Sequence, residues 1–253
     1  ESEGGEYLNE FHLLEESIYL LIFLFDQGLI NTLPEEAESA LDLLDSSAAN
    51  DTEALAARLS RADVLSALDR REEERELLQA SLKSWSDKFE LHMRRASMGL
   101  DELAEDEELR ESFKSAEKAA ALRPWHPTGY QLQGLLKAKA AEIEIQAGRE
   151  ERAAEYLKEA VDAFKACRGI DPSQREYAEE LLYLFGTLYA LLDSPEDKAQ
   201  TLHIEEEVDL LINELKRLGD DTPPYLAALG RTLFESGLES QGESLVERAA
   251  LID

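Results

Sequence analysis

Four histidines and one cysteine are the residues with the chemistry to hold a transition metal or to act as a nucleophile. No two histidines are spaced i, i+4, as on a zinc-binding helix, and no Glu stands three residues before any of them, as in a di-iron bundle. The sequence also contains no glycine-rich phosphate loop and no nucleophile elbow. We therefore expect a non-enzymatic protein with no catalytic residues, no metal and no cofactor. The histidines are His12, His92, His126 and His203.

The cysteine, Cys167, follows Ala160 and Phe164 on one face of an expected helix. A single cysteine can form no intrachain disulfide. A small residue in line with apolar neighbours at helical spacing is typical of a core position, so we predict that Cys167 is a buried core residue and not a nucleophile.

The net charge restricts the partners that the chain can bind. The sequence has 56 acidic and 26 basic residues, a formal charge of -30, and the excess is spread over most of the chain. Such a surface repels nucleic acid and anionic lipid, and fits a protein or peptide partner of basic or mixed apolar character. A saline habitat would produce a similar charge. The longest apolar run, residues 18–25, is far shorter than the roughly 20 residues of a membrane span, so we expect no membrane insertion.

Apolar residues recur at helical spacing nearly from end to end, broken only by short turn signals. The pattern predicts an all-α protein of about 12 helices joined by short loops. Residues 1–5 are expected to form a flexible leader, and the compartment is left open. The expected helices cover residues 6–27, 34–46, 52–69, 72–86, 88–103, 105–122, 127–147, 150–168, 173–192, 195–218, 223–236 and 239–252.

Large and small residues recur at fixed positions within successive pairs of helices. The last pair has Leu226, Leu229, Gly230 and Leu233, then Gly242, Val246 and Ala249. Earlier copies include Leu182, Phe185, Gly186 and Tyr189, and also Tyr130, Gly134, Ala160, Phe164 and Cys167. A further copy has Met93, Ala96, Ser97 and Leu100, and a faint one begins at Ala62. This spacing resembles the tetratricopeptide repeat (TPR). The resemblance implies a right-handed α-solenoid of stacked antiparallel helical hairpins over residues 51–253.

Glycine inside a helix costs about 1 kcal/mol relative to alanine, so its presence needs a packing reason. We predict that Gly134, Gly186, Gly230 and Ser97 lie where the two helices of one hairpin cross closely. The repeat that contains Gly134 is about 14 residues longer than expected. Seven extra residues in each helix would add about two turns and keep the apolar faces in register.

The resemblance implies a function as well as a fold. Members of the family bind partner proteins in a concave groove lined by the first helix of each hairpin. The chaperone-binding members hold a terminal carboxylate with Lys and Asn, but the groove positions here contain only one base and no Asn. The groove positions carried over are Thr128, Gln131, Leu135, Glu180, Tyr183, Thr187, Ala227, Arg231 and Phe234.

Residues 6–50 carry no repeat signature, and the first helix is apolar on two sides. Such a helix either packs on the N-terminal hairpins, capping the solenoid, or forms an interface with a partner or a second copy of the chain. The interface would use Phe11, Ile18, Phe23 and Phe25.

Two further aromatic features leave alternatives. Trp125, between Pro124 and Pro127, is predicted to fill the gap between neighbouring hairpins; the alternative is an exposed contact. An aromatic cluster offers a second hypothesis for function, a helical receptor in a transport pathway outside the cytoplasm that encloses a small apolar ligand. The cluster consists of Tyr177, Tyr183, Phe185 and Tyr189.

Overall fold

The computed structural model describes residues 17–23, 27, 41–42, 51–101, 106–192, 198–218 and 223–252. The chain forms two compact units, Glu1–Arg95 and Ala96–Asp253. Every regular element within the described ranges is helical, which confirms the all-α prediction. The expected helices between residues 51 and 252 are also confirmed, with ends that differ by a few residues. The expected helices 6–27 and 34–46 fall mostly outside the described residues.

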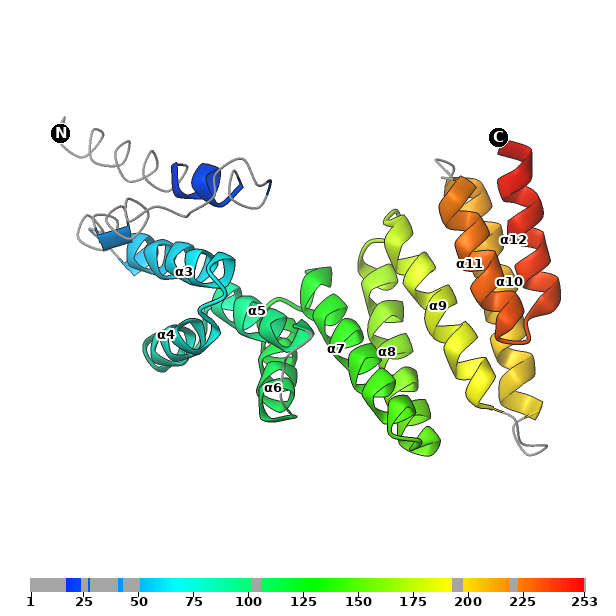
Figure 1. The fold of residues 1–253 in the computed structure, drawn as a ribbon, viewed down its shortest axis with the longest axis horizontal. Helices are drawn as coiled ribbons and strands as arrows, with labels where there is room; N and C mark the ends of the chain where they lie inside the picture. Colours follow the sequence, from blue (N-terminus) through cyan, green and yellow to red (C-terminus); the bar gives the residue numbers. More distant parts are fainter. Residues whose placement is uncertain are drawn as a thin grey trace. The chain divides into compact units, whose positions relative to one another are not determined.

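The helices are labelled as in Figure 1. The first unit contains α3 (Asp51–Ala67), α4 (Arg71–Ser84) and most of α5 (Phe89–Ser97). The second contains the short 3₁₀ helix η1 (Met98–Leu100), α6 (Asp106–Leu122), α7 (Pro127–Gln146), α8 (Glu150–Ile170), α9 (Arg175–Leu191), α10 (Lys198–Leu218), α11 (Pro223–Glu235) and α12 (Glu239–Ile252).

A partly buried arginine joins the helices of the first unit. The Arg94 guanidinium on α5 lies 2.8 Å from the Glu74 carboxylate of α4 and 3.5 Å from that of Asp63 on α3. It also donates a hydrogen bond of 3.3 Å to the carbonyl of Ala62. Because Glu74 is almost fully buried, this charge pairing compensates for the loss of its hydration.

Residues 17–23 form a helical segment that packs on α3. Ile18 is fully buried in a small core with Leu41 and with Ala57 and Val64 of α3. On the other side of the segment, Leu20 and Phe23 are each 57% exposed. Of the residues predicted for an N-terminal interface, Ile18 is therefore used within the unit and Phe23 is accessible. Phe11 and Phe25 lie outside the described residues.

Helices α7 and α8 pair tightly at a glycine. A Cβ added at Gly134 would lie 2.5 Å from the ring of Phe164, which is fully buried. Helices α11 and α12 approach even more closely, through their backbones: a Cβ at Gly242 would lie 2.5 Å from the carbonyl oxygen of Gly230. Gly134 and Gly230 thus lie at the crossing within their own hairpins, as predicted.

The same prediction is wrong for Gly186. The atoms nearest to a Cβ at Gly186 belong to Leu233 of α11 and to Ser236, which follows α11 directly. This glycine therefore allows close packing of α9 on the next hairpin and not on α10, its partner within the same hairpin. In the repeat before α7, Gly99 also approaches α6 closely, and the placement of Ser97 at this crossing stays a prediction. A Cβ at Gly99 would lie 2.5 Å from that of Ser112, because the chain tightens into η1 after Ser97.

The hairpin of α7 and α8 is longer than the last hairpin by the predicted amount. Helices α7 and α8 have 20 and 21 residues, whereas α11 and α12 have 13 and 14. Each helix is thus seven residues longer. Gly134 lies 12 residues before the end of α7, and Gly230 lies 5 before the end of α11. The added turns are therefore at the loop end of the hairpin.

The tryptophan between α6 and α7 does not fill a gap between hairpins. Trp125 is 71% exposed, so the prediction that it is buried is wrong. The space between α6 and α7 next to this turn is already filled. Gly129 packs directly on the backbone of Ala120, and a Cβ added at Gly129 would lie only 2.7 Å from the Ala120 nitrogen. With α6 and α7 already in contact there, the loop side chain points to solvent.

The glycine contacts give a test of hairpin packing. We expect Gly242→Ala to lower the free energy of unfolding by about 1–3 kcal/mol, because the new methyl group overlaps rigid backbone atoms of α11. Gly169→Ala is the matched control: it lies in α8 with nothing within 4 Å of its added Cβ, so helix propensity should raise stability by up to about 1 kcal/mol. Urea denaturation followed by circular dichroism measures both. Equal stability of the two variants would contradict close backbone packing.

Candidate functional site

One face of α7 carries the first three predicted groove residues. Thr128, Gln131 and Leu135 are partly exposed, and Leu135 also packs against the core of the second unit. Thr128 already has hydrogen-bond partners at the start of the helix. Its backbone N–H donates to His126 Nδ1 at 3.4 Å, and its hydroxyl lies 2.9 Å from the same Nδ1. His126 thus caps α7.

The corresponding face of α9 carries Glu180, Tyr183 and Thr187. Tyr183 is 40% exposed, and the Thr187 hydroxyl donates to its carbonyl oxygen at 3.0 Å. Burial raises the pKa of Tyr183, and the negative charge of Glu142 on α7 raises it further. Burial also raises the pKa of Glu180, with a smaller effect from the charge of Glu179. The Glu142 side chain of α7 therefore lies close to that of Tyr183 on α9.

Glu142 was not among the predicted groove residues. It lies seven residues, or about two turns, after Leu135 and so belongs to the same face of α7. In a hairpin of ordinary length this position would fall beyond the helix. The signal that could have identified Glu142 is the predicted two-turn extension.

The predicted residues of α11 lie in different surroundings. Ala227 is partly buried against the core. The Arg231 Nε donates to the carbonyl of Ala227 at 3.2 Å, and Arg231 and Phe234 line a shallow pocket with Gly242 and Val246 of α12. Phe234 and Val246 are 46% and 39% exposed. Arg231 and Phe234 thus line a pocket together with α12, whereas Tyr183 interacts with Glu142 of α7.

Cys167 lies in the core, as predicted. It is fully buried, and its Sγ donates to the carbonyl of Pro127 at 3.4 Å. Burial raises the pKa of its thiol to about 12, so the nucleophilic thiolate is not formed at neutral pH.

The four aromatics proposed to line a ligand cavity do not share one space. Tyr177 and Phe185 are core residues, and Tyr177 packs near Phe164 with ring centroids 6.5 Å apart. Tyr183 is exposed near α7, and the Tyr189 hydroxyl donates to Glu205 of α10 at 3.0 Å. These residues therefore support the packing of α9 on several sides and do not favour a receptor.

Two absences hold for the described part of the chain. No three His, Cys, Asp or Glu side chains there are close enough to hold a metal ion together. None of the helices found there has the length and apolar character needed to cross a membrane.

Comparison with known proteins gives a structural likeness and no sequence match. No protein-family model matches the chain, and neither does any curated protein. The structure is similar to that of Pseudomonas aeruginosa pilF, with a TM-score of 0.56 and 16% identity over 96% of this chain and 91% of that one. The fold is TPR-like. A second similar structure is TTC0263, a thermophilic TPR protein of Thermus thermophilus, with a TM-score of 0.47 and 19% identity over 76% of this chain and 88% of that one.

In this TPR-like stack, α7, α9 and α11 are the first helices of their hairpins, and α8, α10 and α12 are the second. Figure 1 shows α7 and α8 as neighbouring antiparallel helices, with α9 following α8. Two ion pairs join the second helices: Lys165 to Glu207 at 2.9 Å, and Arg168 to Glu214. These pairs connect α8 with α10.

The surroundings of Cys167 make a direct prediction. Because burial raises the pKa of its thiol to about 12, we expect the native protein to react negligibly with Ellman's reagent at pH 8. Full reaction should follow only after unfolding in guanidinium. The absorbance of the released thiol measures both. Rapid reaction of the native protein would show that the hairpin of α7 and α8 opens around Cys167 on the time scale of the assay.

Proposed function

We propose that this chain is a non-enzymatic scaffold that binds a basic segment of a partner protein on the faces of α7 and α9. The observation that carries the proposal is the grouping of Glu142, Glu180 and the partly exposed ring of Tyr183. We call these three residues the acidic groove. The wider binding face includes the predicted residues Thr128, Gln131, Leu135 and Thr187.

The chemistry of the acidic groove suits a lysine or arginine side chain. Two carboxylates attract the cation, and an exposed tyrosine ring can stack against it, which contributes about 0.5–1 kcal/mol at an exposed site. Leu135 adds an apolar contact for the neighbouring residue of the partner. The net charge of -30 would speed the approach of a basic partner and disfavour acidic ones at this face.

The proposal is tested with an array of random 12-residue peptides. Wild type is expected to select sequences enriched in Lys and Arg. The variant Glu142→Gln/Tyr183→Ala/Glu180→Gln is expected to bind the selected peptides at least about tenfold more weakly, because charge-assisted contacts and the aromatic contact are lost together. Fluorescence polarisation gives the dissociation constants, and binding to wild type should weaken as salt is raised.

The control variant is Arg110→Met/Arg152→Met, whose changes lie on α6 and α8 and leave the acidic groove intact. It should bind the basic peptides as tightly as wild type. If the groove variant selects the same peptides with unchanged affinity, the proposed binding face is wrong.

A second candidate function is supported by the N-terminal segment. Leu20 and Phe23 are large apolar residues that share a surface in the first unit and are each 57% exposed. An interface with a second copy of the chain would remove them from water, and each fully buried side chain would contribute about 1.5–3 kcal/mol. We propose this surface as the candidate for self-association.

Self-association is tested by sedimentation velocity of wild type and of Leu20→Ser/Phe23→Ser. Wild type should form dimers or larger species whose fraction rises with concentration, and the variant should remain monomeric. Val246→Ser, which alters an exposed apolar residue of α12, serves as the control and should not change the distribution. A monomeric wild type at every concentration would exclude this candidate.

A further inference from the structure

A second polar surface lies between α6 and the long hairpin of α7 and α8, and it has the opposite charge to the acidic groove. Here a cavity of about 190 Å³ is lined by three arginines and by a single carboxylate. The arginines are Arg110, Arg149 and Arg152, and the carboxylate is Glu144. Among the charged residues that line it, the balance is thus two positive charges, in a chain of net charge -30. We call this surface the arginine pocket.

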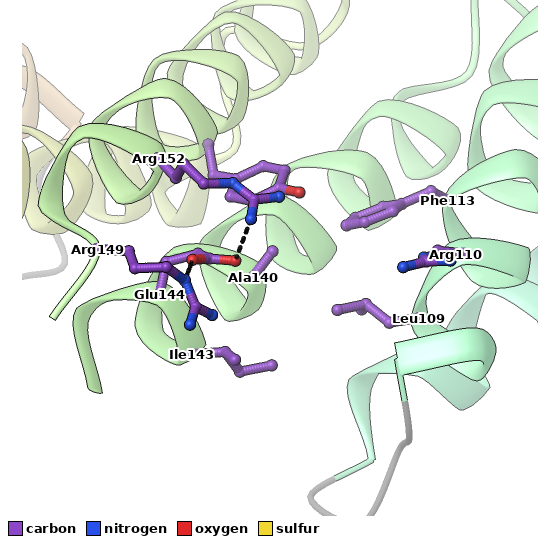
Figure 2. Close-up of a pocket in the computed structure, with 9 residues that line it drawn as sticks. Leu109, Arg110, Phe113, Ala140, Ile143, Glu144, Arg149 and Arg152 are labelled. Atoms are coloured by element: carbon purple, nitrogen blue, oxygen red, sulfur yellow. Dashed lines mark hydrogen bonds and ion pairs between the residues drawn. The ribbon is translucent and has the colours of Figure 1, made fainter. Parts of the chain in front are cut away.

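The geometry of the arginine pocket leaves cationic groups available. Figure 2 shows Arg110 and Phe113 extending from α6 toward the side formed by Glu144, Arg149 and Arg152. Arg149 pairs with Glu144, whereas Arg152 reaches the same carboxylate only at 3.7 Å and remains 59% exposed. Arg110 has no hydrogen-bond or ion-pair partner among the residues that the structure describes. An anion entering the pocket would therefore meet Arg110 and Arg152 without first breaking a strong pair.

An aromatic and aliphatic wall completes the arginine pocket. The rings of Phe113 and Tyr156 are stacked, with centroids 6.4 Å apart, and the Lys137 ammonium lies 4.5 Å from the Phe113 centroid. Leu109 and Ile143 add aliphatic surface to the lining. A ligand that carries an anionic group beside an apolar one matches this combination.

The two-turn extension produces most of this surface. Glu144, Arg149 and Arg152 all lie near the loop end of the hairpin, where α7 and α8 extend beyond the length of α11 and α12. The charged side chains of the extension are not required for the crossing of α7 and α8, which is made at Gly134 and Phe164. Their convergence with Arg110 of α6 is thus a property of this particular hairpin.

We propose that the arginine pocket binds a carboxylate of a partner peptide, with an adjacent apolar side chain placed against Phe113 and Tyr156. Arginine holds a carboxylate through two parallel hydrogen bonds, which gives both strength and direction. At physiological salt the Debye length is about 8 Å, so the more distant negative charges of the chain are largely screened from the bound group. The carboxylate can come from the C-terminus of the partner or from a Glu or Asp side chain.

The test uses three small probes and backbone amide NMR of the ¹⁵N-labelled full chain. Acetyl-phenylalanine carries a terminal carboxylate, acetyl-Glu-Phe-amide carries a side-chain carboxylate, and acetyl-Gln-Phe-amide is neutral. At least one acidic probe is expected to shift the amides of residues 109–113 and 143–156, with a dissociation constant on the order of 1 mM for ligands of this size. The neutral probe should bind at least about tenfold more weakly. The stronger acidic probe identifies the source of the carboxylate.

Two variants separate this surface from the acidic groove. Arg110→Met/Arg152→Met retains the aliphatic stems of two exposed side chains and should weaken the acidic probes about tenfold or more, with an unchanged thermal unfolding midpoint. Tyr183→Ala should bind them as wild type does. Arg149 is left unchanged because its N–H and side chain both contact Glu144 at the hairpin loop.

Several outcomes would overturn the proposal: equal binding of acidic and neutral probes, unchanged binding by the arginine variant, or amide shifts confined to other helices. Inorganic phosphate, which has the charge but no apolar group, should bind more weakly than the acidic probes. Tighter binding of phosphate would refute the assignment to a peptide carboxylate. None of these results depends on whether basic peptides bind the acidic groove.

Discussion

The close approach of paired helices at glycine is the constraint on which the second unit depends. At Gly230 and Gly242 the backbones of α11 and α12 are so near that either Cβ would overlap a carbonyl oxygen of the other helix. Each glycine lowers the intrinsic stability of its helix, and the packing gained across the crossing offsets that cost. Because a crossing fixes the rotation of each helix about its axis, it also decides which residues of α7 face the acidic groove and which face the arginine pocket.

The extension of α7 and α8 is compatible with this constraint because seven residues make nearly two full turns. The apolar face therefore continues past Gly134, and the added turns pack through small residues such as Ala141 and Ala153, both fully buried. The extension also lengthens the polar faces of the hairpin. Glu142 on one side of α7 and Glu144 on the other both belong to it, so one insertion contributes to both candidate surfaces.

Local sequence features were sufficient to predict the helices, the paired glycines and the buried Cys167, because periodicity, turn residues and spacing within one hairpin determine them.

Features that depend on contacts between hairpins were not predictable in the same way. Gly186 contacts α11, which begins 37 residues later in the chain, and no spacing rule states which helix will cover that position. Trp125 was predicted to fill a gap between hairpins, whereas the direct contact of Gly129 with Ala120 leaves it in solvent. The groove positions on α7 were taken from a repeat of ordinary length, so Glu142 was missed. Arg110 and Arg152 were missed because they are 42 residues apart and meet only through the fold.

The distribution of the few basic residues explains how a chain of this charge can present two surfaces of opposite sign. Arg94, Lys165, Arg168 and Arg175 are engaged in ion pairs that join or stabilise helices. Arg110 and Arg152 are instead directed to a cavity whose only lining carboxylate is already paired with Arg149.

The acidic groove and the arginine pocket lie on roughly opposite sides of α7, because Leu135 and Glu144 are nine residues, or about two and a half turns, apart. A helix is about 10 Å thick. That thickness is close to the Debye length at physiological salt. If both proposals hold, a basic ligand on one side and an acidic ligand on the other would be about one Debye length apart, so their interaction would be partly screened and one hairpin could bind both.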